Sequence, residues 1–332
     1  MIGAVPSWPW FPSEADRDIN KQLSACCVIT GAASGLGLAT ARKLVHEGYT
    51  VIGCDRNAMA LDRISLELGN LFRPLVCDLT SPKSMREAAE TLAELQPDGI
   101  DALIHFAGLH SAGPLMDLSE HEFASVVDVN LTGVWRAQKS FFSALEVRRG
   151  RTIIISSEVA YARFSHAFSG AYSLSKIAVD QLAVTLRQEL ALLEPPMDVV
   201  LLNIGMFSTP LLSQAANAFS TYSDRHMGSP FTVAMGWADG MAKWYMQRGL
   251  VGDSAHHSPD IVARKVVQVL QCRKPRKRYC VSVSSLMHLV RWIPSSVLDM
   301  AIITVLRAQM YGFAQGAREL LTTVLTAIMY IL

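Results

Sequence analysis

A tyrosine and a lysine four residues apart are the side chains whose types and spacing point most directly to chemistry. Tyr172 and Lys176 open a stretch with helical character, so their side chains would share one face of a helical turn. A phenol can give or take the proton of an alcohol, but its ordinary pKa is about 10. A neighbouring ammonium stabilises the phenolate by about 1.4 kcal/mol for each pKa unit of lowering. The pair therefore predicts a general acid/base, Tyr172, whose pKa Lys176 lowers.

A glycine-rich turn near the start of the chain has the features of a phosphate-binding site. The apolar run 25–29 leads to Gly31, Gly35 and Gly37, and residues 38–45 then carry apolar side chains at helical spacing. Glycines allow the backbone to approach a ligand closely, and a helix N-terminus offers unpaired N–H groups to a pyrophosphate. The spacing G-x-x-x-G-x-G differs from the commoner G-x-G-x-x-G motif. A tight turn without a ligand is therefore the alternative.

An acidic residue ends the second expected strand, which covers residues 50–54. Asp55 lies about 20 residues beyond the glycines, where a carboxylate can accept hydrogen bonds from an adenosine ribose and repel a 2′-phosphate. This position favours NAD(H) as the cofactor. The neighbouring Arg56 would partly offset the repulsion, so NADP(H) stays the alternative.

Strand and helix patterns alternate from residue 25 onward, which predicts an α/β fold with a doubly wound parallel sheet. Half of the 332 residues are hydrophobic, enough for a sizeable core. Further strands are expected at 72–77, 100–106, 151–155, 198–202 and 279–283, and helices at about 57–68, 81–95, 119–147, 171–193 and 259–271, with a loop over 158–171. The expected division is an N-terminal extension (1–24), a catalytic domain (25–285) with a helical lid at about 206–252, and an apolar C-terminal helical extension (286–332).

With these elements in place, residues 24–285 resemble the short-chain dehydrogenase/reductase family. The matching features are the turn Thr30–Gly37, Asp55, Asp78-Leu79, Ala107-Gly108, Asn130, Ser157, Tyr172-x-x-x-Lys176 and Gly205-x-x-x-Thr209. Each is weak alone, but all occur in order at the expected strand ends or in the expected helices. The resemblance implies a single Rossmann-type domain of about seven strands that carries both the cofactor and the substrate site.

The resemblance also implies a role for each matching residue. Tyr172 would be the general acid/base, and Lys176 would in addition hold the nicotinamide ribose. Ser157 would hydrogen-bond the substrate oxygen, and Asn130 would hold a water that relays protons from Lys176. No metal is implied. The residues expected at the cofactor are Gly31, Ala33, Ser34, Gly35, Leu36, Gly37, Asp55, Arg56, Asp78, Leu79, Ala107, Gly108, Tyr172, Lys176, Gly205 and Thr209.

The strand before Ala107 departs from the family pattern, which commonly has two asparagines where His105 and Phe106 stand. The usual asparagine is largely structural and bonds neighbouring strand backbone. A histidine would replace it in part; a catalytic His105 is the alternative.

The interval from Ser157 to Tyr172 is two residues longer than is usual in the family, which predicts a longer loop beside the substrate. Ser156 is the competing serine, but alternation along a strand directs it to the other face. Ile204 replaces the proline that usually precedes Gly205.

The lid region 206–252 is rich in methionines and aromatic residues. Most should pack the lid onto the body, and the rest would line a large apolar pocket. This composition favours a bulky hydrophobic alcohol or ketone, such as a steroid, retinoid or fatty chain, and a place in lipid metabolism. The basic run Arg273–Arg278 before Tyr279, and the segment Val290–Asp299, resemble hydroxysteroid and retinol dehydrogenase-type members.

The last residues, 301–332, are unusually apolar, yet no uncharged apolar run reaches the roughly 18 residues of a membrane span. This segment would dock on the body, pair between subunits, or lie on a membrane surface with the basic run nearby. The first 24 residues lack a signal-peptide pattern, and the six cysteines lack metal-like spacing. Reduced thiols in an intracellular protein, cytoplasmic or peripherally membrane-associated, are therefore expected. The net charge of +1 points to no nucleic-acid partner.

These features together predict an NAD(H)-dependent oxidoreductase that interconverts an alcohol with a ketone or aldehyde. A homodimer or homotetramer joined through helices 119–147 and 171–193 is expected from the resemblance. One alternative is an NADPH-dependent carbonyl or 3-oxoacyl reductase, against which Asp55 argues. Another is a nucleotide-sensing scaffold without catalysis, against which the four intact candidate catalytic side chains argue.

Overall fold

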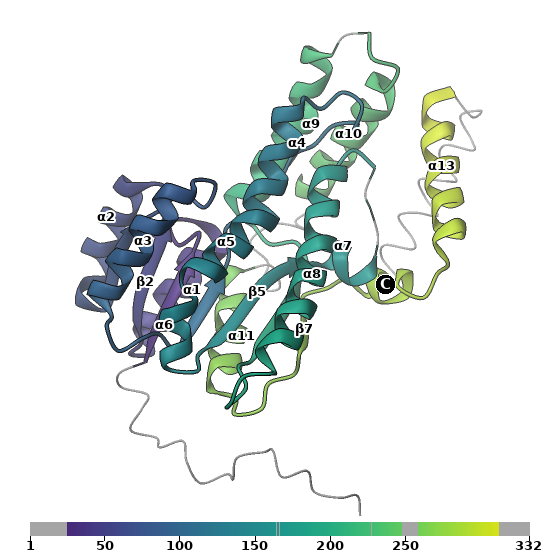
Figure 1. The fold of residues 1–332 in the computed structure, drawn as a ribbon. Coiled ribbons are helices and arrows are strands. Elements are labelled where there is room, and N and C mark those ends of the chain that lie inside the picture. The colour runs from purple at the N-terminus through teal and green to yellow at the C-terminus, as the bar shows by residue number, and fades with distance from the viewer. Residues whose placement is uncertain (1–24, 164, 166, 227, 248–257, 312–332) are drawn as a thin grey trace, which may run out of the picture.

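Seven parallel strands form one sheet in the order β3-β2-β1-β4-β5-β6-β7, which confirms the expected doubly wound fold (Figure 1). The strands are β1 (Cys26–Thr30), β2 (Thr50–Asp55), β3 (Phe72–Val76), β4 (Ala102–His105), β5 (Arg151–Ser157), β6 (Val199–Ile204) and β7 (Arg278–Val281). The strand order reverses between β1 and β4. In such sheets a crevice forms at the carboxyl ends of the two strands where the order reverses.

The computed structural model describes residues 25–163, 165, 167–226, 228–247 and 258–311. The expected N-terminal extension, the end of the expected lid at 248–252 and the final residues 312–332 lie outside these ranges.

Helices cover both faces of the sheet and bury one hydrophobic core on each side. The first core joins the sheet to α1 (Gly35–His46), α2 (Ala58–Leu68) and α11 (Pro259–Gln271). The second joins it to α3 (Pro82–Leu95), α5 (Gly133–Ser140), α6 (Phe142–Val147) and α8 (Gly170–Leu190). A 3-10 turn, Gly69–Leu71, connects α2 to β3.

Strand β1 shows why the sheet needs near-continuous apolar runs. Cys27 and Ile29 point into the first core, and Cys26 and Val28 into the second, because side chains alternate along a strand. Both cysteines are free and buried, as the sequence predicts for reduced thiols.

The stretch expected as one helix over 119–147 is divided. Helix α4 (Glu120–Val127) runs into a π-helical turn, Asp128–Thr132, before α5 and α6. The wider turn contains the buried Asn130, and such π-turns often occur at functional sites.

The stretch 158–171 was expected to be a loop, and that prediction is wrong at its start. Helix α7 (Glu158–Ala162) follows β5 directly, with Ser157 as its N-cap: the Ser157 hydroxyl accepts a bond from the Val159 N–H at 3.4 Å. The extra residues between Ser157 and Tyr172 therefore include a helical turn beside the strand end.

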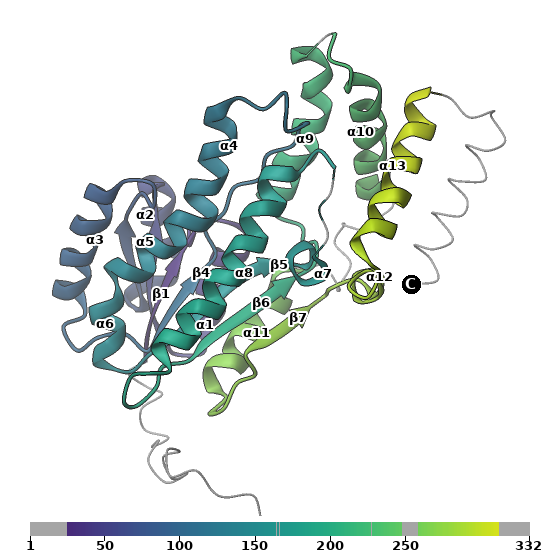
Figure 2. The same cartoon turned by 45° about the vertical axis from the view of Figure 1, so that its right-hand side comes forward.

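The remaining helices lie beyond the carboxyl ends of the strands. Helices α9 (Pro210–Arg225) and α10 (Thr232–Gln247) pack against each other, and α13 (Ser295–Tyr311) lies along α10 after the short α12 (Ser285–Val290) (Figure 2).

The basic run Arg273–Arg278 leads into the first residue of β7, whereas α12 follows the other end of that strand. The basic run and the described helices α12 and α13 therefore lie at opposite ends of β7. Most of the apolar segment 301–332 lies outside the described residues, so its place relative to the basic run stays a prediction. None of the helices within the described ranges is both long and apolar enough to cross a membrane. Contact of the C-terminal helices with a membrane surface stays a prediction.

Candidate active site

A cleft of about 390 Å³ lies where the strand order reverses, at the carboxyl ends of β1 and β4. This volume is within the range of cofactor pockets. It is lined by thirteen of the residues expected at the cofactor: Gly31, Ala33, Ser34, Gly35, Leu36, Gly37, Asp55, Arg56, Asp78, Leu79, Ala107, Gly108 and Thr209. The other lining residues are Cys54, Asn57, Cys77, Phe106, Leu109, Val129, Pro210, Leu211 and Gln214, and most of them are sequence neighbours of the thirteen.

Beneath this cleft, the backbone at Gly31 and Gly37 lies very close to other backbone. A Cβ at Gly37 would lie 2.1 Å from the Gly31 carbonyl oxygen, which no real contact permits. Gly31 has a φ of +73°, and a Cβ there would lie 2.7 Å from the Ala107 nitrogen. The turn after β1 thus packs backbone to backbone against the turn after β4. A dinucleotide fits the resulting surface, because exposed backbone at the start of α1 faces the cleft.

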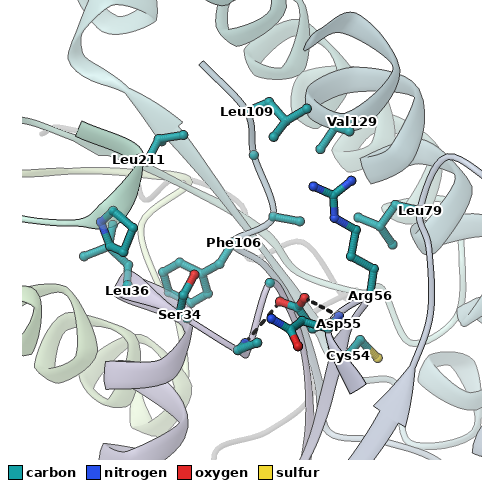
Figure 3. A pocket seen from close by; sticks show the side chains of 18 of the residues that line it. Ser34, Leu36, Cys54, Asp55, Arg56, Leu79, Phe106, Leu109, Val129 and Leu211 are labelled. Atoms are coloured by element: carbon teal, nitrogen blue, oxygen red, sulfur yellow. Dashed lines mark hydrogen bonds between the residues drawn. The ribbon is translucent and has the colours of Figure 1, made fainter. Parts of the chain in front are cut away.

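Asp55 and Arg56 stand side by side at the end of β2 (Figure 3). The Asp55 carboxylate accepts the Ala33 N–H at 3.1 Å and the Asn57 N–H at 3.0 Å, which fixes its orientation. The exposed Arg56 side chain extends away from Asp55 toward Leu79 (Figure 3). The cleft therefore offers both a fixed carboxylate and a guanidinium at the place expected to bind the adenosine ribose.

Tyr172 and Lys176, on the first turns of α8, were also expected at the cofactor but do not themselves line this cleft. The Lys176 Nζ is 5.8 Å from the centre of the Tyr172 ring and 3.3 Å from the Ile155 carbonyl oxygen, to which it donates. A Cβ at Gly108 would lie 3.7 Å from this Nζ and 3.4 Å from the Asn130 Oδ1. Both polar groups therefore converge on a residue that lines the cleft.

Asn130 is locked between the loop after β4 and helix α8. Its Oδ1 accepts the Leu109 N–H at 2.7 Å, and its Nδ2 donates to the Leu109 carbonyl and to the Ser175 Oγ, both at 2.9 Å. The π-turn presents this side chain inward from the middle of a helix. Local sequence pattern does not indicate the turn.

Burial is the largest cause of the pKa shifts of Tyr172 and Lys176. It raises the pKa of Tyr172; a hydrogen bond with Ser157 works against the rise and the Glu158 carboxylate adds to it. Burial also lowers the pKa of Lys176 to about 8, although Asp180 acts in the opposite direction. In the protein alone, the pKa of the phenol therefore moves opposite to the predicted direction.

The two candidate serines point to different partners. Ser157 lies close enough to Tyr172 to lower the pKa of its phenol through hydrogen bonding, whereas the Ser156 hydroxyl is buried and donates to the Lys176 backbone carbonyl at 3.3 Å. Ser157 is thus the serine that can face a substrate bound at Tyr172.

His105 is buried, and its contacts are with residues outside this centre. Its Nε2 lies 3.3 Å from the Gln138 Oε1, which also accepts the Thr152 hydroxyl at 3.1 Å. Burial lowers the pKa of His105 to about 4, so the ring is neutral at pH 7. Its contacts support the structural alternative, with a side chain of α5 as partner in place of strand backbone.

Gly205 and Thr209, both expected at the cofactor, have different roles. Thr209 lines the cleft and packs against the glycine turn, since a Cβ at Gly35 would lie 3.5 Å from the Thr209 Cβ. Gly205 does not line the cleft; a Cβ there would lie 1.9 Å from the Ser282 carbonyl oxygen. Gly205 therefore serves the close approach of β6 to the end of β7.

A second cleft of about 330 Å³ adjoins the first at Leu109. The sequence predicts a large apolar pocket beneath the lid, but of the methionine, phenylalanine, tyrosine and tryptophan side chains in the described part of the lid, Tyr222 alone lines this cleft. The cleft lies between the loop after β4, helix α4 and helix α9. Its lining includes His110, whose ring centre is 4.5 Å from that of Tyr172. Tyr222 and Ser229 of the lid both donate to the Asp117 carboxylate, which ties the lid to this loop. His110 was not among the predicted site residues; its place two residues after Gly108 is the signal that could have indicated it.

Comparison with known proteins agrees with this geometry. The family model for short chain dehydrogenases matches residues 25–218. A serine 3-dehydrogenase of Rhizobium radiobacter is 33% identical over 172 residues, which cover 51% of this chain and 67% of that protein. An NADPH-dependent 3-dehydrocapnine reductase of Ornithobacterium rhinotracheale is 28% identical over 280 residues, 82% of this chain and 94% of that protein.

A solved structure of actinorhodin polyketide ketoreductase with NADPH is also similar, with a TM-score of 0.62 and 26% identity over 80% of this chain and 98% of that one. The chain belongs to the short-chain dehydrogenase family and is an oxidoreductase that uses a nicotinamide cofactor.

Proposed function

We propose that this enzyme interconverts an alcohol with a ketone or aldehyde, with Tyr172 as general acid/base. The observation that carries the proposal is the convergence of Asn130 and Lys176, the neighbour of Tyr172, on Gly108 in the lining of the cleft. A nicotinamide bound there would accept or donate the hydride. The polar groups of the chain would handle the proton.

Each polar side chain at this end of the cleft has one task. The Tyr172 hydroxyl gives a proton to the carbonyl oxygen during reduction and takes it back during oxidation. Ser157, whose hydroxyl lowers the pKa of that phenol, donates to the same substrate oxygen. Lys176 supplies positive charge, and oxidised nicotinamide adds more. Both oppose the rise that burial gives to the pKa of Tyr172.

The test compares two tyrosine variants. Tyr172→Phe is expected to lower kcat by at least about a hundredfold while cofactor binding, followed by nicotinamide fluorescence, stays largely intact. Tyr161→Phe is the matched control. Tyr161 lies on α7, its hydroxyl bonds His288 of α12 at 3.0 Å, and it is not part of this centre. Retained turnover in Tyr172→Phe contradicts the assignment.

For the cofactor, we propose NAD(H), selected by the fixed Asp55 carboxylate. A second candidate is NADP(H), because Arg56 lines the same cleft and two of the similar proteins are described with NADPH. The two cofactors are titrated side by side. Asp55→Ala is expected to weaken NADH binding about tenfold or more, whereas Arg56→Ala leaves it nearly unchanged. A tenfold loss of NADPH binding in Arg56→Ala, with tighter NADPH than NADH in the unaltered protein, would favour the second candidate.

For the substrate, the composition of the lid supports a bulky hydrophobic alcohol or ketone of the steroid, retinoid or fatty-chain class. Phe207 belongs to the first core and packs the start of the lid onto the body. Met235 on α10 is buried as well, while Met206 and Val233 keep exposed apolar surface. The second cleft adds His110 and other polar side chains next to Tyr172. A substrate with an apolar body and one polar end would suit both features. A panel of such alcohols, set against sugars of similar size, tests this class.

A further inference from the structure

Three polar side chains from three different elements bond one another behind the candidate catalytic centre. Arg278 of β7 donates through its Nη1 to the Asp180 carboxylate of α8 at 2.6 Å and to the Asn203 Oδ1 of β6 at 2.7 Å. The Asn203 Nδ2 donates to the same carboxylate at 3.2 Å. Asn203 is fully buried and Asp180 is 8% exposed, so removing one of these side chains leaves the others with buried polar atoms that have lost a partner.

This triad connects the two elements that carry the candidate catalytic side chains. The Asn203 Nδ2 also donates to the backbone carbonyl of Ser157, at 3.0 Å, where β5 ends. Asp180 follows Lys176 by one helical turn and Tyr172 by two, on the same face of α8. The position of Ser157 relative to Tyr172 and Lys176 is therefore fixed through Asn203 and Asp180.

We propose that Asp180, Asn203 and Arg278 are positioning residues for the reaction. Asn203 holds Ser157 in register with Tyr172, and the Asp180 carboxylate holds Lys176 as the charged neighbour of the phenol. The proposal rests on the proposed function for its kinetic consequences, but its electrostatic consequence concerns the protein alone.

The electrostatic part follows from the charges around Lys176. Burial lowers its pKa and Asp180 opposes that effect. The other charged groups nearby are Arg278 and Arg187, which face Asp180, and Glu158 on α7, which faces Tyr172. Replacing Asp180 by asparagine keeps the side-chain shape and removes the negative charge, so the pKa of Lys176 should fall further below about 8.

The experiment compares the variants Asp180→Asn and Asn203→Leu with a control variant, Asp198→Asn. The control breaks another arginine–carboxylate pair, Arg151–Asp198, whose charged atoms lie 2.8 Å apart. Asp198 directly precedes β6, at the end of that strand opposite to Asn203. For each protein, kcat and KM are measured across pH, and Lys176 is titrated without cofactor by ¹³C NMR of labelled lysine, with Lys176→Arg assigning the signal.

Asp180→Asn is expected to move both the NMR titration of Lys176 and the pH profile to lower pH, and to lower kcat about tenfold or more. Asn203→Leu lowers kcat by a similar factor without moving the Lys176 titration, because no charge is removed. Asp198→Asn changes neither.

Unchanged kcat in Asn203→Leu, or an unmoved Lys176 titration in Asp180→Asn, would overturn the corresponding part of the proposal. If Asp180→Asn does not fold, Asp180→Glu takes its place: it keeps the charge, so it should lower kcat and keep the titration. If the unaltered protein transfers no hydride at all, the proposed function fails, while the NMR titration still decides the role of Asp180.

Discussion

Acid should destabilise this protein through one buried histidine. His105 is 1% exposed and its pKa in the folded protein is lowered from 6.5 to about 4 by burial. An unfolded chain therefore binds the proton first as pH falls. The stability that the neutral ring contributes is fully present above pH 6.5 and is lost as pH falls toward 4.

The two pKa values of 6.5 and about 4 fix the size of the effect. Protonation of His105 in the unfolded chain should lower the free energy of unfolding by about 2 kcal/mol at pH 5 and about 3 kcal/mol at pH 4. The perturbation is His105→Asn, which removes the titrating ring. Carboxylates titrate alike in both proteins, so the difference between their unfolding free energies isolates His105.

Urea unfolding followed by circular dichroism at pH 7, 6 and 5 measures this difference. At pH 7 the variant should be less stable, because it loses the bond to Gln138 and part of the buried ring. That deficit should shrink by about 2 kcal/mol between pH 7 and pH 5. His46→Asn, at a histidine whose side chain is 79% exposed, gives the baseline for loss of a surface histidine. A deficit in His105→Asn that stays constant from pH 7 to pH 5 would refute the reasoning.

Two further predictions concern the glycine turn and self-association. Gly37→Ala should weaken cofactor binding and destabilise the protein by about 1–3 kcal/mol, because the new Cβ would lie 2.1 Å from the Gly31 carbonyl oxygen. The control is Gly236→Ala, whose Cβ would meet nothing within 4 Å. If the two variants behave alike in thermal melts and in fluorescence titration with cofactor, this prediction is contradicted. We also propose that a second copy of the chain covers the exposed Phe123, Trp135, Leu174 and Ile177 on α4, α5 and α8. Trp135→Glu should then reduce the mass measured by light scattering, Met59→Glu on α2 should not, and a monomeric unaltered protein would exclude this interface.

Most of the fold and the cofactor cleft could be predicted because their signals are local. The glycine turn, Asp55 and the pair Tyr172 and Lys176 each lie within one strand–turn–helix unit, and parallel strands bring the carboxyl ends of these units together. The alternation of buried side chains along β1 follows from strand geometry. These features therefore need no knowledge of distant partners.

What could not be predicted depends on contacts between residues far apart in the chain. The partner of His105 is Gln138, 33 positions away, and the bond between Arg278 and Asp180 spans 98 positions. The π-turn around Asn130 has no sequence signal, because the helical pattern continues through it. The direction in which the pKa of Tyr172 moves depends on burial, which is known only once the lid and α7 are in place.

The central claim is hydride transfer at Tyr172, and label transfer from the cofactor tests it most directly. NADH and NADPH deuterated on the nicotinamide C4 are incubated with a panel of hydrophobic ketones and aldehydes, and the alcohols are analysed by mass spectrometry. The unaltered protein should place one deuterium on the carbinol carbon, and Tyr172→Phe should place almost none while still binding cofactor. Cofactor binding without label transfer to any carbonyl would contradict the account and point to a nucleotide-binding protein without catalysis.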